Sequence, residues 1–317
     1  TEPGSDREQL TSLARTCSGI GDAIPTVLTM TVVPILGAGS SMADYRIGFK
    51  LWALIIAVVF VISELVCVAC VPERPVACDE KPGKISDMFK ALFKNDQAMT
   101  VVVSIILVYT SLNICGNLVL YFFRFDVGNE GAYSIFAAVA FAAQVLVMMV
   151  IPLLRKRFSK SQLFISGFII QIAGFAVILI MAFAKLYTPQ SWYILCLPGI
   201  LIYLGYGMLN VIMTIFLSDS VDYGEVMNGT REESVIFSMQ TFTVKLASGV
   251  AVFLAGLVVD WIHLDTAAAV QTQDTLDALR MWMTIPSVIL LIVGIFVFKR
   301  FYKLDDTRME EIKSKLN

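Results

Sequence analysis

One lysine, Lys245, lies well inside an otherwise apolar stretch, SVIFSMQTFTVKLASGVAVFLAGLVVD. A lysine at that depth of a membrane helix costs several kcal/mol unless it is paired or faces a water-filled cavity. Thr241 lies four residues earlier and therefore on the same helix face. This pattern predicts a binding or coupling site. The simpler alternative is a side chain that extends to the membrane surface.

A second group of ionisable residues lies in the segment SDSVDYGEVMNGTREE, residues 218–233. Asp219, Asp222 and Glu225 recur every three residues, so a continued helix would place them on one face. Charge pattern alone favours a solvated acidic loop between two spans. Arg231 follows in the same segment.

Other polar side chains fall inside apolar stretches. Asn113 and Asn117 are one turn apart and could face a central cavity, or could form hydrogen bonds between helices. Tyr203 and Tyr206 lie in the Gly-rich stretch YLGYG, where an aromatic ring could stack on a bound ligand or pack against a neighbouring helix.

Enzymatic and metal chemistry find no support. The chain has one histidine, His263, and no Ser-His-Asp set, phosphate loop or HExxH motif. Cys67 and Cys70 have metal-ligand spacing but lie in the apolar stretch VISELVCVACV, where cysteine behaves as a small hydrophobic residue. We therefore expect no enzyme activity, no resident metal and no cofactor.

The elements that must position these residues are membrane helices. Of the 317 residues, 57% are hydrophobic and only 16% are charged, whereas soluble domains carry about a quarter charged residues. Apolar stretches long enough to cross a bilayer, which takes about 20 residues, predict an all-α polytopic membrane protein. Its eight spans are predicted at residues 16–38, 47–71, 98–123, 131–154, 161–184, 190–217, 235–260 and 280–300.

The orientation of these spans follows from their basic residues, because cytoplasmic loops retain Lys and Arg. With the amino terminus inside, inner segments hold eighteen of the 24 Lys and Arg residues and outer segments hold five. Both termini are therefore predicted to be cytoplasmic, in a cell membrane. The bilayer is the expected partner, and neither nucleic acid nor an obligate protein partner is implied.

A charged stretch, residues 72–97, separates the first two spans from the last six. Its second half, ISDMFKALFKND, has apolar residues at helical spacing and predicts a short amphipathic helix on the inner membrane surface. Six spans after a linker are typical of one half of a two-bundle transporter.

A family resemblance rests on several motifs. The segments SDSVDYGE (218–225), TREE (230–233) and FSMQTF (237–242), followed by Lys245, resemble the signature of the glycoside–pentoside–hexuronide:cation symporters of the major facilitator superfamily. DREQLTSL (6–13) resembles the segment that these carriers have before their fifth helix. The two matches lie near opposite ends of the chain, in the expected order.

The resemblance implies that the eight spans are helices five to twelve of a twelve-helix sugar carrier. Residues 1–71 would end the amino-terminal bundle, 72–97 join the bundles, 98–304 form the carboxy-terminal six-helix bundle, and 305–317 form a cytoplasmic tail. Arg15 falls where the melibiose carrier contacts sugar, and Thr241 and Lys245 fall in its sugar and coupling region.

The function implied is symport of a sugar or glycoside with Na⁺ or H⁺ by alternating access. The expected substrate-binding residues are Arg15, Thr241, Lys245, Asn113, Asn117 and Tyr206, and the expected coupling or gating residues are Lys245, Asp219, Asp222, Glu225 and Arg231. The family's cation site lies on helices outside this chain. Two other classes remain open, namely a complete eight-helix channel or receptor-like protein and a membrane enzyme acting on lipid-linked sugars.

Overall fold

The computed structural model describes residues 5–39, 42–70, 93–229, 233–266, 268 and 270–316, and within these ranges every regular element is a helix. The long helices are α1 (Ser5–Gly37), α2 (Met42–Cys70), α4 (Asp96–Tyr121), α5 (Ala132–Leu154), α6 (Lys160–Phe183), α7 (Cys196–Asn228), α8 (Glu233–Trp261) and α9 (Gln273–Phe301). Shorter elements are the π-helix η1 (Phe122–Asp126), the 3₁₀ helix η2 (Trp192–Leu195) and α10 (Asp306–Leu316).

Seven of the described helices are long and apolar enough to cross a membrane. An eighth span is present if the two segments of α1, Glu8–Thr29 and Thr31–Gly37, count as one bent helix. Pro25 and Pro34 lie inside α1, and proline removes a backbone hydrogen bond and bends a helix. The prediction of an all-α polytopic membrane protein is confirmed, and the eight predicted spans correspond to these seven helices and the bent α1.

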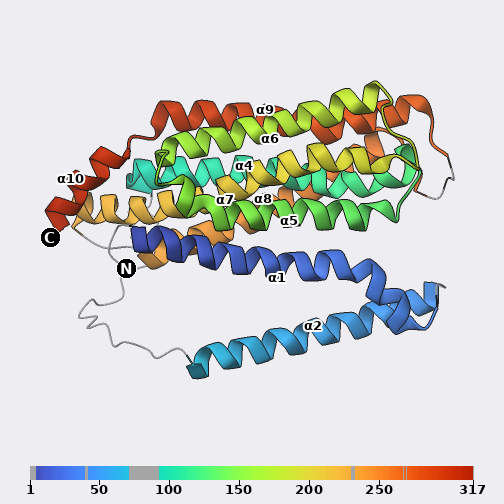
Figure 1. Ribbon diagram of the computed structural model, residues 1–317, viewed down its shortest axis with the longest axis horizontal. Coiled ribbons are helices and arrows are strands. Elements are labelled where there is room, and N and C mark those ends of the chain that lie inside the picture. The colour runs from blue at the N-terminus through green and yellow to red at the C-terminus, as the bar shows by residue number, and fades with distance from the viewer. Residues whose placement is uncertain are drawn as a thin grey trace. The chain divides into compact units, whose positions relative to one another are not determined.

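The larger of two compact units comprises residues 1–19 and 85–317. Its six long helices, α4 to α9, run side by side (Figure 1). The most extensive helix contacts are α6 with α7, α4 with α9, α4 with α8, and α5 with α7. Most of the apolar segment of α4 and of α7 is buried inside the unit, whereas much less of the apolar segment of α8 and of α9 is buried. Helices α4 and α7 therefore form its core.

The smaller unit comprises residues 20–84. In its described part, the second half of α1 and the start of α2 form a close pair, and the Trp52 indole donates to the Thr29 hydroxyl over 2.8 Å. No residue of the apolar segment of α2 is buried in the structure. The helix is nevertheless regular, because a continuous apolar sequence without proline satisfies its backbone hydrogen bonds internally.

Local signals explain where several helices begin and end. Ser159 and Gln162 form a reciprocal capping box at the start of α6, which satisfies two backbone donors. Asn95 caps α4 and Thr272 caps α9. Gly229 ends α7 with φ +74°, a left-handed conformation that glycine adopts without a steric penalty.

The interpretation of residues 218–228 as a solvated loop is wrong. Helix α7 continues through them to Asn228, and the Asp219 and Asp222 residues are buried. The charge pattern favoured a loop because it does not reveal the buried partner of Asp219. That partner is Lys160, which lies 59 residues away in the sequence. The predicted amphipathic helix in residues 72–97 falls almost entirely outside the described residues.

Candidate functional site

A row of polar side chains lies on one face of α7. Tyr206, Asn210 and Thr214 are spaced four residues apart, which places them one above another on the helix. All three are buried. Polar groups inside an apolar bundle are costly unless they form hydrogen bonds, so their partners define the candidate site.

Two other helices converge on Thr214. The Arg15 Nε of α1 donates to the Thr214 Oγ1 over 2.9 Å, and the Gln240 Nε2 of α8 donates to the same oxygen over 3.3 Å. Thr214 in turn donates to the Asn210 carbonyl one turn earlier, over 3.0 Å. One hydroxyl thus joins α1, α7 and α8, and it brings a guanidinium and an amide together.

An aromatic pair continues the row. The Asn210 amide lies 2.7 Å from the Tyr109 hydroxyl of α4 and 3.4 Å from the Tyr206 hydroxyl. The two tyrosine rings meet edge to face, with their centroids 5.6 Å apart. Hydroxyl, amide and guanidinium groups beside aromatic rings offer both the donors and the apolar faces that a hydroxyl-rich ligand requires.

The structure brings Arg15 and Tyr206 into this network but not the other predicted substrate residues. The Thr241 hydroxyl bonds back to Phe237 of its own helix over 3.3 Å. The Asn113 and Asn117 amides likewise donate to carbonyls one turn earlier, each over 2.7 Å. Lys245 is exposed, and no ion pair joins it to any residue that the structure describes.

An ionic cluster lies at the end of the larger unit that is predicted to be cytoplasmic. The Lys160 Nζ is 2.5 Å from the Asp219 Oδ2, and their side chains are only 8% and 5% exposed. Asp306, at the start of α10, lies 3.6 Å from the same nitrogen. Burial makes such pairs sensitive, because removing one partner leaves the other charge uncompensated.

Arg155 extends the cluster to α1. Its guanidinium binds both carboxylate oxygens of Glu8, over 3.1 and 3.0 Å, and lies 3.2 Å from the Asp306 Oδ1. Burial alone would lower the pKa of Arg155, but the hydrogen bonds and charges of Glu8 and Asp306 raise it above its ordinary value. Arginine therefore stays charged and holds α1, α10 and the loop after α5 together.

The remaining predicted gating residues have separate positions. Asp222 is buried and Glu225 is half-buried on the extended α7, and each has an interaction partner. Arg231 lies outside the described residues. Tyr302, beside the cluster, has its pKa raised by burial and by the nearby charge of Asp219.

A second buried ion pair lies at the opposite end of the larger unit. The Arg280 guanidinium binds Asp126 with distances of 2.5 and 3.1 Å, and the Tyr187 hydroxyl donates to the same carboxylate. Their side chains are 5% exposed for Arg280 and 2% for Asp126. Burial and the Asp126 charge raise the pKa of Tyr187. Sequence reasoning missed this cluster, because its members are distant in the chain.

One signal in the sequence could have identified part of the network. Tyr206, Asn210 and Thr214 recur every four residues in an apolar helix, which marks a polar face. No local sequence pattern marks Tyr109 as a member of the network. The convergence of Arg15 and Gln240 on Thr214 depends on how three helices pack, which the sequence does not show.

Comparison with known proteins finds matches along the whole chain. Residues 1–306 match the model of the family described as MFS/sugar transport protein. The raffinose carrier protein of Pediococcus pentosaceus is 24% identical over 100% of this chain and 49% of its own length. The isoprimeverose transporter of Lactiplantibacillus pentosus is 24% identical over 96% of this chain and 62% of its own length.

A lactose permease of Lactobacillus delbrueckii subsp. bulgaricus is also 24% identical, over 98% of this chain and 49% of its own length. This chain thus spans between 49% and 62% of the length of these three relatives. The relatives are carriers rather than enzymes. Because the family model covers nearly every residue, the chain belongs to the MFS/sugar transport protein family and is a multi-pass membrane protein.

Proposed function

We propose that the native protein containing this chain imports a sugar or glycoside across the cell membrane, coupled to Na⁺ or H⁺. Relatives named for raffinose, isoprimeverose and lactose support a saccharide substrate. In this proposal residues 98–304 act as one six-helix half of the carrier, and the two halves alternate in exposing a midplane site. Both termini are cytoplasmic, and no resident cofactor is required.

The observation that carries the proposal is the convergence on Thr214. Arg15, Gln240 and Thr214 come from three helices, and Asn210 extends the same network to the tyrosine pair. Buried polar side chains inside a membrane bundle mark substrate or ion pathways. A sugar displaces these mutual hydrogen bonds with its own hydroxyl groups and packs its apolar face against the tyrosine rings.

Lys245 has the coupling role in this proposal, together with the ionic cluster. A cation that is bound near the site competes electrostatically with the lysine for carboxylates, so cation occupancy changes the charge balance at Lys245. The contacts among Glu8, Arg155, Lys160, Asp219 and Asp306 close the predicted cytoplasmic end and must break when that end opens. Asp222, Glu225 and Arg231 belong to the same gating segment, and Thr241, Asn113 and Asn117 line the pathway.

The test measures accumulation of labelled lactose, raffinose and isoprimeverose by cells that express the native protein and do not metabolise these sugars. An imposed Na⁺ or H⁺ gradient should drive accumulation of at least one of them. Lys245→Ala should abolish accumulation, because the charge that responds to the cation is gone. Lys299→Ala is the matched control, since Lys299 is exposed in the last turn of α9 and should be neutral.

Three outcomes are informative. If the unsubstituted protein accumulates none of the sugars under either gradient, symport is refuted. Downhill flux without accumulation would favour the channel alternative. Unchanged accumulation in Lys245→Ala, with transport otherwise intact, would remove Lys245 from the coupling mechanism and leave the sugar assignment in place.

A further inference from the structure

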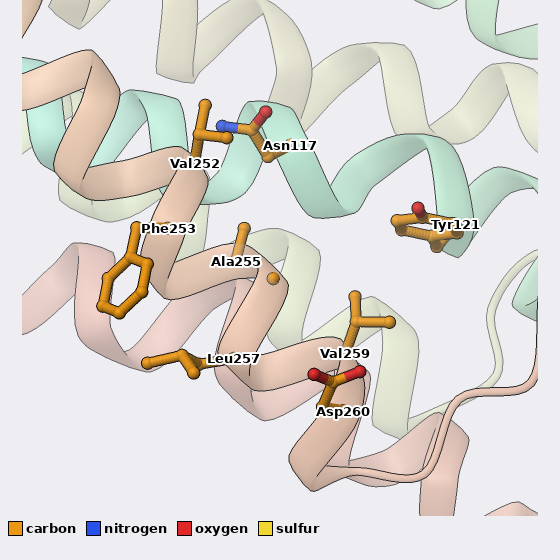
Figure 2. A pocket seen from close by; sticks show the side chains of 9 residues that line it. Asn117, Tyr121, Val252, Phe253, Ala255, Leu257, Val259 and Asp260 are labelled. Carbon is orange, nitrogen blue, oxygen red and sulfur yellow. The ribbon is translucent and has the colours of Figure 1, made fainter.

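A cavity of about 550 Å³ lies between α4 and α8 (Figure 2), and none of the residues that line it belongs to the Thr214 network. Asn117 and Tyr121 line it from α4, four residues apart and therefore on one face. Residues between Val252 and Asp260 line it from α8. All these residues belong to the larger unit. The volume is within the range of small-molecule sites, roughly 300–1,000 Å³.

The lining combines three polar groups with an apolar wall. Asp260 contributes a carboxylate, Tyr121 a hydroxyl and Asn117 an amide, and the remaining residues, among them Phe253 and Leu257, are apolar. The Asn117 amide donates one hydrogen to Asn113, and no bond to a described residue occupies its carbonyl oxygen. The cavity lining therefore offers both acceptors and donors beside an apolar surface that includes an aromatic ring.

This chemistry favours a neutral ligand with many hydroxyl groups. A carboxylate accepts hydrogen bonds from two neighbouring hydroxyls of a sugar, and such charge-assisted bonds are the stronger ones. A lipid chain offers no hydrogen-bond donor to the exposed Asp260 carboxylate, whereas the hydroxyl groups of a sugar do. A bound metal is disfavoured, because the described residues contain no group of three or more His, Cys, Asp or Glu side chains that could hold one.

The cavity lies on the same face of α8 as two predicted site residues. Thr241, Lys245, Val252 and Gly256 project within a narrow sector of a helix that has 3.6 residues per turn. Asp260 is fifteen residues beyond Lys245, or about 22 Å along the axis. By the charge distribution, that direction leads to the extracellular end.

We infer that this cavity is an outer sugar-binding subsite, separate from the Thr214 network, in which Asp260, Asn117 and Tyr121 bind sugar hydroxyls. The inference rests on the proposed sugar transport for its ligand class. The subsite captures sugar before it reaches the midplane, and the shared face of α8 leads from the subsite to Lys245 and Thr241. Asp260 is its specificity-determining residue, because its carboxylate selects hydroxyl donors.

Gly256 allows a clean steric test, because a Cβ added there meets no atom within 4 Å. Gly256→Phe therefore adds a large side chain at the cavity wall without a clash at its Cβ. Gly116→Phe is the matched control, since Gly116 has the same open surroundings on α4 and does not line the cavity. For Asp260→Asn, the control is Glu130→Gln, an exposed carboxylate before α5.

Equilibrium dialysis of the purified native protein against labelled lactose, raffinose and isoprimeverose gives the number of bound molecules. We expect two per protein, and one in Gly256→Phe. Asp260→Asn should weaken the second binding event by about tenfold, the value of one or more charge-assisted hydrogen bonds. Both controls should bind two molecules with unchanged affinity.

A second measurement covers the case in which Gly256→Phe does not fold. In Gly256→Cys, the same sugars should slow alkylation of the introduced thiol by a maleimide, and Asp260→Asn in the same protein should remove that protection. Sugar accumulation with one bound molecule and no protection would overturn the subsite and leave symport standing. Two bound molecules without accumulation would refute symport and leave the subsite standing, and no binding at all would overturn the subsite.

Discussion

At the scale of single residues, the Thr214 hydroxyl links three other residues of the larger unit. Its hydroxyl accepts from Arg15 and Gln240 and donates to the Asn210 carbonyl. A buried acceptor shared by two donors is sensitive, because its removal leaves both donors unsatisfied. The candidate site therefore depends on one hydroxyl whose two donors come from other helices.

Thr214→Val preserves the shape of the side chain and removes the hydroxyl. We expect a lower melting temperature and at least a tenfold weaker uptake affinity for the transported sugar, because a hydrogen bond to a charged group contributes roughly 1.5–3 kcal/mol. Thr284→Val is the control, since among the residues that the structure describes the Thr284 hydroxyl bonds to the Arg280 carbonyl one turn earlier and to no other group. Equal effects of the two substitutions on uptake would show that the network does not bind substrate.

At the scale of elements, the position of α7 depends on glycines at its contact with α6. A Cβ at Gly205 would lie 2.5 Å from the Gly167 carbonyl oxygen and 2.7 Å from the Gln171 backbone nitrogen. Gly174 similarly faces the backbone of Ile202. Small residues let membrane helices approach closely, and close packing is what drives their association. These glycines therefore position the face of α7 that carries the polar row.

Gly205→Ala should force α6 and α7 apart. We expect a loss of about 1–3 kcal/mol in the free energy of unfolding, the usual cost of overpacking, with a parallel loss of sugar binding. Gly116→Ala is the control, because a Cβ there meets no atom within 4 Å. Thermal unfolding of the detergent-solubilised native protein compares the stability of the two variants. An unchanged melting temperature for Gly205→Ala would contradict the close contact between α6 and α7.

At the scale of the whole molecule, the two ends of the larger unit are closed by different ion pairs. Glu8, Arg155, Lys160, Asp219 and Asp306 form one cluster, and Arg280, Asp126 and Tyr187 form the other. The basic residues that predict a cytoplasmic end are therefore partly engaged in buried contacts. Orientation in the membrane and closure of the predicted inner end involve some of the same side chains.

The predicted orientation is testable with single introduced cysteines. In intact cells, Glu130→Cys should react with a membrane-impermeant maleimide, and Arg157→Cys should react only after the membrane is permeabilised. Both positions are exposed in the structure. Their reactivity toward the maleimide should therefore differ only because they lie on opposite sides of the membrane. The unsubstituted protein sets the background from its own cysteines. The reverse labelling pattern would invert the topology.

The sequence alone determines the membrane class, the approximate spans and the family resemblance, because long apolar stretches and contiguous motifs are local features. Arg15 and Tyr206 were also identified from sequence, and both belong to the polar network. Thr241, Asn113 and Asn117 were also predicted to bind substrate; their polar groups donate to carbonyls of their own helices and lie outside the Thr214 network, so their role stays a prediction.

Only the tertiary structure shows that Thr214 joins three helices, that Asp219 is buried against Lys160, and that Arg280 pairs with Asp126. The partners of these residues lie between 26 and 199 positions away in the chain. Hydropathy and periodicity report which face of a helix is polar, but not which helix covers that face. The free energy of a buried charge or hydroxyl depends on that partner, so the contacts of the site are decided by packing.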